Sequence, residues 1–166
     1  MAHDAYIRFE GISSRNPDSE RPGWMRLLSL RHGLEQPMSG SAGTGGQDAP
    51  ARARHSDLLI EKLLDDTSPI LSFYCCSGRL IPQATVEIWD AGAGRHKFME
   101  YQLSKVLVRS TRVHLPLVQV QESGATLLEE IGLQYARIEW TYTLNNADGP
   151  MGNINHFWDT TQNRGG

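Results

Sequence analysis

The alternation of apolar and polar residues constrains the fold of this chain more than any other sequence feature. In residues 84–89, Ala84, Val86 and Ile88 point to one side of an extended chain, and the residues between them point to the other. The same period of two predicts a first strand over residues 5–10. Because a period of two is typical of half-buried strands, the pattern predicts a sheet with one buried face.

Two of the alternating segments change phase partway along. In the first, the apolar positions are in one phase up to Leu103 and in the opposite phase from Val106. The second, predicted as the last long strand over residues 131–142, behaves in the same way. A phase change indicates a bulge or a switch of the buried face, and strands of this kind are common where a sheet bends into a barrel. We therefore predict a mainly β fold, a single barrel of antiparallel strands in one domain over residues 1–166.

The predicted core consists of apolar residues on the buried faces of these strands: Val86, Ile88, Leu103, Val106, Leu133 and Ile138.

One short α-helix is predicted on the side of the barrel, between Ser68 and Gly78. Ser68 suits the N-cap, Pro69 the first helical turn, and Gly78 the left-handed position that follows a helix. A second strand is predicted over residues 25–32. Residues 57–64 remain ambiguous, because their apolar positions fit either a helix face or a short strand.

Residues 35–56 form a long segment, rich in glycine and serine, with almost nothing to bury. A loop of this length inside a compact domain usually means function or disorder. A phosphate-binding loop is disfavoured, because no Gly-Lys-Ser/Thr follows the glycines and no helix clearly opens there. We expect a surface loop, whose basic cluster of Arg52, Arg54 and His55 is either a solvated flank or a contact surface.

The charge balance disfavours two classes of partner. The chain has 16 basic and 19 acidic residues, a formal net charge of −3, which argues against binding to nucleic acid and to membrane surfaces. No apolar run approaches the roughly 18 residues that span a membrane, so we expect no membrane insertion. The first ten residues lack the basic start and apolar stretch of a signal peptide, which predicts a cytoplasmic protein.

Residues that carry catalysis or bind metals form no recognisable pattern. The six histidines lack the close spacing of a zinc site, and no serine stands in a Gly-x-Ser-x-Gly turn. The adjacent Cys75 and Cys76 cannot form an ordinary disulfide without strain, and we expect both to be mostly buried thiols. We therefore predict a protein that is not an enzyme and uses no catalytic residue, metal or cofactor.

The order of these elements resembles the haemolysin-coregulated protein (Hcp) family, the tube subunit of bacterial type VI secretion systems. The clearest stretches are residues 65–71 and 77–88, with a Ser-Pro helix start, a glycine, and Pro-Gln-Ala entering a strand. Further matches are residues 101–110, residues 129–142, Gly149, and Trp158 with Asp159. Two features depart from the family pattern. Leu30 and His32 stand where members often carry tryptophan, and residues 115–121 are unusually apolar.

The resemblance implies a β-barrel that forms hexameric rings, which stack into a hollow tube. A contractile sheath would drive the tube, tipped by a VgrG-like spike protein, into a neighbouring cell, with effectors in the ring lumen. The subunit would be cytoplasmic and then secreted without a signal peptide. The resemblance also favours a strand over residues 57–63, an extended loop over residues 35–56, and a family tail over residues 145–166.

Site residues follow from the same resemblance. The stacking loop would contribute Met38, Gly43, Gly45, Gly46, Arg52, Arg54 and His55. Ser29 and Arg31 would face the lumen and contact cargo, although Arg31 on the outer wall is an equal alternative. Two other functions stay open: a phage-type tail-tube protein, and a small-ligand-binding or enzymatic β-barrel.

Overall fold

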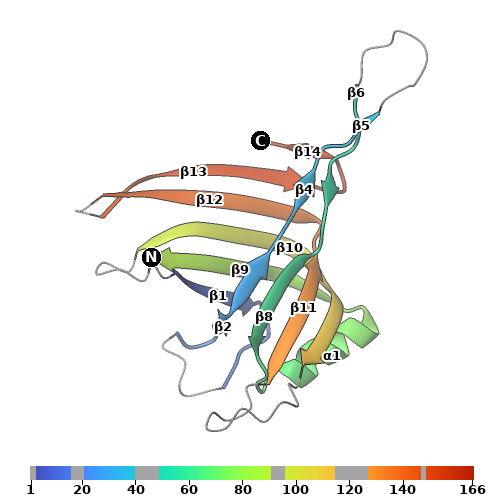
Figure 1. Ribbon diagram of the computed structural model, residues 1–166, viewed down its shortest axis with the longest axis vertical. Coiled ribbons are helices and arrows are strands. Elements are labelled where there is room, and N and C mark those ends of the chain that lie inside the picture. The colour runs from blue at the N-terminus through green and yellow to red at the C-terminus, as the bar shows by residue number, and fades with distance from the viewer. Residues whose placement is uncertain (1–2, 16–20, 40–48, 91–95, 115–126, 147–148) are drawn as a thin grey trace.

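The computed structural model describes the chain except for residues 1–2, 16–20, 40–48, 91–95, 115–126 and 147–148 (Figure 1). The apolar residues 115–121 lie outside the described residues.

Antiparallel strands wrap around one apolar core and form a barrel-like sheet. They are β1 (His3–Phe9), β2 (Met25–Leu27), β3 (Ser29–Arg31), β8 (Leu58–Leu63), β9 (Leu80–Asp90), β10 (Lys97–His114) and β11 (Leu128–Gln134). Their order in the sheet is β2–β1–β9–β10–β11–β8–β3. The mainly β fold class is thereby confirmed, and the ambiguous residues 57–64 contain the strand β8.

The predicted single strand over residues 25–32 is instead two short strands, β2 and β3, separated by Leu28. β2 pairs with β1, and β3 pairs with β8. The two ends of the sheet are therefore joined through the break at Leu28, rather than by one continuous strand. The side chain of Leu28 is exposed.

Both predicted phase changes are real, and they lie opposite each other. The first is in β10, and the second is between β11 and the strand that follows it. Lys105 lies between the fully buried Leu103 and Val106, and its backbone takes a left-handed conformation with φ +52°. Opposite this kink, the predicted strand over residues 131–142 breaks at Tyr135 and continues as β12 (Arg137–Asn146). The prediction of one long strand is therefore wrong. β11 stays in the barrel-like sheet between β10 and β8, whereas β12 leaves it.

Five of the six predicted core residues, Val86, Leu103, Val106, Leu133 and Ile138, are fully buried. Ile88 is only partly buried, so this part of the prediction is wrong. The reason is its position near the end of β9, where β1 and β10 also begin and the core is less enclosed.

The helix is α1 (Ser68–Ser77), which packs Leu71 into the core. Pro69 lies in its first turn, and Gly78 follows it in the left-handed conformation, as predicted. Ser68 is not the N-cap: Thr67 occupies that position, and the Ser68 hydroxyl donates a hydrogen bond to Glu129 in β11 (2.6 Å). No helix among the described residues is long and apolar enough to cross a membrane.

The two adjacent cysteines lie near the end of α1 as free thiols. Cys75 is partly buried, but Cys76 is exposed, so the expectation that both are mostly buried is wrong. The two residues point in different directions from the helix, because successive positions are about 100° apart around its axis.

The last strands extend the sheet beyond the barrel. β13 (Gly149–Asp159) pairs with β12 along its length, and β14 (Arg164–Gly165) pairs with the end of β13. In Figure 1 the β12–β13 hairpin reaches away from α1. The predicted tail over residues 145–166 is therefore mostly strand.

Candidate functional site: the arm and its base

The segments 33–39 and 49–56 leave the barrel side by side as a two-stranded projection, which we call the arm. Its described strands are β4 (Leu34–Glu35), β5 (Met38–Ser39), β6 (Ala49–Pro50) and β7 (Arg54–His55). β4 pairs with β7 and β5 with β6, and the amide of Ser56 donates to the carbonyl of Gly33 (3.0 Å). The arm therefore continues the β3–β8 ladder outwards (Figure 1). Its described part is a paired ribbon, where the sequence predicted an unpaired loop.

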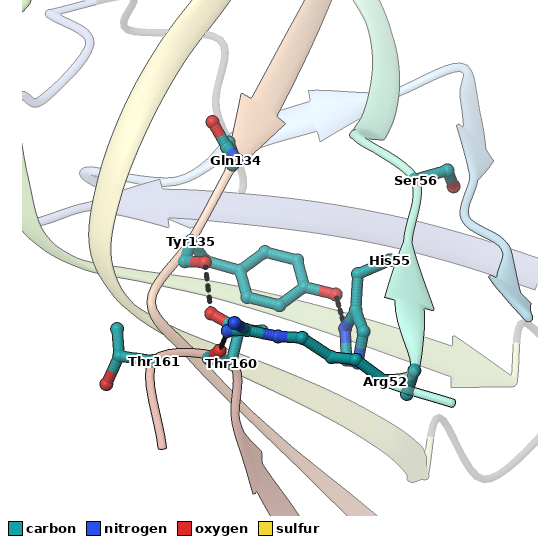
Figure 2. A pocket seen from close by; sticks show the side chains of 8 residues that line it. Arg52, His55, Ser56, Gln134, Tyr135, Thr160 and Thr161 are labelled. Carbon is teal, nitrogen blue, oxygen red and sulfur yellow. Dashed lines mark hydrogen bonds between the residues drawn. The ribbon is translucent and has the colours of Figure 1, made fainter. Parts of the chain in front are cut away.

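A tyrosine and two histidines join the arm to the barrel. His32 precedes the first strand of the arm and His55 lies in the last, so each is at the foot of one arm strand. Both contact the hydroxyl of Tyr135, at the break between β11 and β12. The His32 Nε2 and the His55 Nδ1 each lie 2.7 Å from this oxygen. Figure 2 shows the Tyr135 ring reaching across to His55.

The environment of this cluster favours its neutral forms. Burial lowers the pKa of His32, and the nearby His55 lowers it further. Burial also lowers the pKa of His55. Burial raises the pKa of Tyr135, and the carboxylate of Asp57 adds to that rise. At neutral pH the cluster is therefore two neutral imidazoles around one protonated phenol.

A pocket of about 260 Å³ lies between the arm and the barrel. It is lined by Arg52, Ala53, His55, Ser56, Gln134, Tyr135, Thr160 and Thr161 (Figure 2). The Arg52 guanidinium crosses it and donates to the carbonyl of Thr160, while the Thr160 hydroxyl donates to the carbonyl of Tyr135 (3.3 Å). Through Thr160, Arg52 therefore provides a second link between the arm and the break between β11 and β12.

The groups at the arm base lack the arrangement that nucleophilic catalysis needs. The Ser56 hydroxyl is bonded to the backbone of Gly33, donating to its carbonyl (3.1 Å) and accepting from its amide (2.8 Å). Among the described residues, its hydrogen-bond partners are thus backbone groups and not a base that could activate it. No cluster of metal-binding side chains is found in the part of the chain that the structure describes. The geometry is suited to holding the arm in place.

The structure separates the predicted stacking residues into two groups. Met38 and Arg54 are exposed on the arm, and the Met38 side chain is 59% accessible. Arg52 and His55 instead contact Thr160 and Tyr135 of their own chain. Gly43, Gly45 and Gly46 lie outside the described residues.

The predicted lumen residues belong to a row of polar side chains on the outside of the barrel. Ser29, Glu61, Glu130 and Arg112 lie opposite one another on β3, β8, β11 and β10. The Ser29 hydroxyl donates to Glu61 (2.6 Å), and Glu130 forms ion pairs with Arg31 (2.6 Å) and Arg112 (2.8 Å). We call these five residues the polar row.

Sequence reasoning missed His32 and Tyr135 as functional candidates. One available signal was that His32 and His55 flank the glycine-rich segment almost symmetrically. Another was that Tyr135 stands where the alternation changes phase.

The chain thus combines a barrel-like β fold with a projecting two-stranded arm. Comparison with known proteins specifies the class further. The family model described as "Type VI secretion system effector, Hcp" matches residues 6–142. The chain belongs to the Hcp family of type VI secretion proteins.

Individual relatives agree with this assignment. Protein hcp1 of Pseudomonas aeruginosa is 30% identical over 111 residues, 64% of this chain and 65% of the relative. A solved structure of a type six secretion system protein has a TM-score of 0.84 at 22% identity, covering 99% of this chain and 100% of that one. Hcp1 from Salmonella typhimurium has a TM-score of 0.76 at 22% identity, covering 99% of each chain. These two structures support the fold.

Proposed function

We propose that this chain is a single-domain tube subunit that assembles into hexameric rings, and that the arm stacks one ring on the next. The membership of the Hcp family supports assembly into a tube. The observation that carries the role of the arm is its outward projection from the barrel with exposed apolar side chains. Closed rings arise when one surface meets a different surface with six-fold rotation, and a further contact along the axis makes a filament.

The arm has the chemistry of a contact element. Met38 and Leu34 expose 59% and 51% of their surfaces, and Arg54 is exposed beside them. Apolar side chains on a narrow projection have few neighbours in their own chain, so a facing subunit would remove them from water. Arg54 would add a charge that favours an acidic surface on the adjacent ring.

The polar row is the surface that we assign to the lumen of the ring. Ser29 and Arg31 belong to it, and its charged side chains form ion pairs with one another, which leaves a hydrated wall. Such a wall suits the passage of effectors without tight binding. In this proposal the remaining partners are a contractile sheath and a VgrG-like spike. The subunit is cytoplasmic before the type VI machine secretes it.

The alternative functions have less support. A small-ligand-binding barrel needs an internal cavity, but the interior here is filled by fully buried residues such as Val86, Leu103 and Ile138. The family match favours a type VI protein over a phage-type tail-tube protein. The described polar groups at the arm base lack a catalytic arrangement, which supports a structural role without enzymatic activity.

The test is to shorten the arm by deleting residues 39–47. We expect the variant to keep hexamers in gel filtration but to form shorter tubes and to be secreted less. A point variant, Met38→Asp, should act in the same direction. Phe73→Asp is the matched control, because Phe73 is 60% exposed on α1, at the opposite end of the molecule from the arm (Figure 1). Tubes of parental length from the shortened protein would contradict the role of the arm.

A further inference from the structure

One phenol is shared by both feet of the arm. His32 and His55 are 23 positions apart, yet both ring nitrogens lie 2.7 Å from the same Tyr135 oxygen. The ring centroids of His32 and His55 lie 5.8 Å and 5.7 Å from that of Tyr135. Tyr135 therefore holds both strands of the arm against the barrel at a single point.

The number of protons in this cluster determines which hydrogen bonds can form. A phenol has one proton to donate, and its oxygen can accept. Each neutral histidine has one N–H group and one bare nitrogen. Both hydrogen bonds form when one histidine donates to the Tyr135 oxygen and the other accepts the Tyr135 proton. If the accepting histidine becomes protonated, it no longer offers a bare nitrogen to the Tyr135 proton, and the hydrogen bond that the phenol donated to it is lost.

We propose that Tyr135 is a pH-sensitive clamp on the arm, which holds the arm on the barrel while His32 and His55 are neutral and releases it when they are protonated. Protonation of both histidines also places two positive charges about 6.4 Å apart, measured between the ring centroids. The loss of a bond and the charge repulsion therefore act in the same direction.

The neighbouring charged and titratable groups leave this direction unchanged. Tyr101 of β10 stacks edge-on against His32 and stays neutral, because burial raises its pKa. Asp57 would favour a protonated histidine, but it is paired with Arg109 of β10 (3.6 Å). Arg52 carries a positive charge in the adjoining pocket and disfavours further positive charge.

The sign of the pH dependence follows from the lowered pKa values of both histidines in the clamped state. A released arm exposes them, and their pKa values return to about 6.5. Above that pH both states are neutral and the clamp is strongest. As the pH falls from about 6.5 to the lowered values, the released state binds protons first. Its population then rises by up to about tenfold per pH unit for each histidine.

Amide hydrogen exchange of the intact protein tests this directly. The readouts are the amides of Ala51 and Ser56, which bond across the arm to Pro37 and Gly33, with rates corrected for the intrinsic effect of pH. We expect their protection to fall by tenfold or more between pH 7.5 and pH 5.5, while core amides of β10 keep theirs. Equal protection at both pH values would overturn the proposal, and this series needs no variant.

Two variants sharpen the experiment. Tyr135→Phe keeps the ring and removes the hydroxyl, so the arm amides should be weakly protected at pH 7.5 and their protection should no longer depend on pH. His114→Asn is the control, because His114 is exposed at the end of β10, and this variant should keep the parental pH profile. A parental profile in Tyr135→Phe would overturn the clamp. The clamp does not depend on ring stacking: an arm that loosens at pH 5.5 without shortening tubes would contradict the proposed function alone.

Discussion

Removing the charge of Lys62 should destabilise the barrel more than any change to its surface ion pairs. The Lys62 side chain is 1% exposed and the Glu129 side chain 0%, and they form an ion pair at 3.2 Å between β8 and β11. Lys62 also pairs with Asp65 (2.9 Å) and donates to the Ser68 hydroxyl at the start of α1 (3.2 Å). Oε1 of Glu129 has no hydrogen-bond partner among the described residues.

The magnitude follows from what Lys62→Met would leave behind. Glu129 would keep only the hydrogen bond from Ser68, as a fully buried and uncompensated carboxylate. Breaking a buried ion pair in this way costs about 3–5 kcal/mol. For a domain of this size each kcal/mol lowers Tm by about 2–4 °C, so we expect a decrease of about 10 °C. That loss is a large share of the roughly 5–15 kcal/mol that stabilises a typical domain.

The assay is urea unfolding, followed by tryptophan fluorescence at a fixed protein concentration. The control is Arg31→Met, which removes the exposed ion pair to Glu130 and should cost less than about 1 kcal/mol. The double variant Lys62→Met with Glu129→Leu removes both charges and should recover most of the stability. A cost for Lys62→Met no greater than for Arg31→Met would refute this reasoning, as would a double variant that merely adds the two single losses.

Three further predictions follow from burial and contacts. Ile138→Ala should cost about 2–4 kcal/mol in urea unfolding, because Ile138 is fully buried. The control Ile154→Ala, at an exposed position, should change the free energy of unfolding by no more than about 0.5 kcal/mol, and equal costs would contradict the assigned core. Arg21→Met should cost about 1–2 kcal/mol in the same assay, since Arg21 lies over three aromatic rings and pairs with Glu87 at 2.7 Å, and an unchanged midpoint would contradict this. Cys76 should react with a thiol reagent faster than Cys75, because only Cys76 is exposed. Peptide mass spectrometry after brief labelling measures the order, and faster labelling of Cys75 would contradict the prediction.

The features that could be predicted from the sequence depend on near neighbours in the chain. Alternation gave the buried faces of β9 and β10, because the period of two is a local property of a strand. Pro69 and Gly78 marked the helix for a similarly local reason. The phase changes near Leu103 and Tyr135 indicated bends. That the two bends face each other depends on strand register, which no single segment carries.

The features that could not be predicted depend on distant partners. Ser68 looked like an N-cap, but its hydroxyl is taken by Glu129, which is 61 residues away. The arm has no hydrophobic alternation to mark its strands, so its pairing was not visible. His32 and Tyr135 are 103 residues apart and meet only because the arm and the strand break lie at the same end of β8 and β11. The sequence therefore identified the segment that contains the arm, but not the side chains that join it to the barrel.

Electron microscopy of the purified protein tests the central claim, that this chain is a ring-forming tube subunit. We expect six-fold rings with an open centre, each built from six copies of the 18.5 kDa chain, with stacked rings at higher concentration. Single 18.5 kDa particles at every concentration would contradict the account, as would rings whose centre is closed.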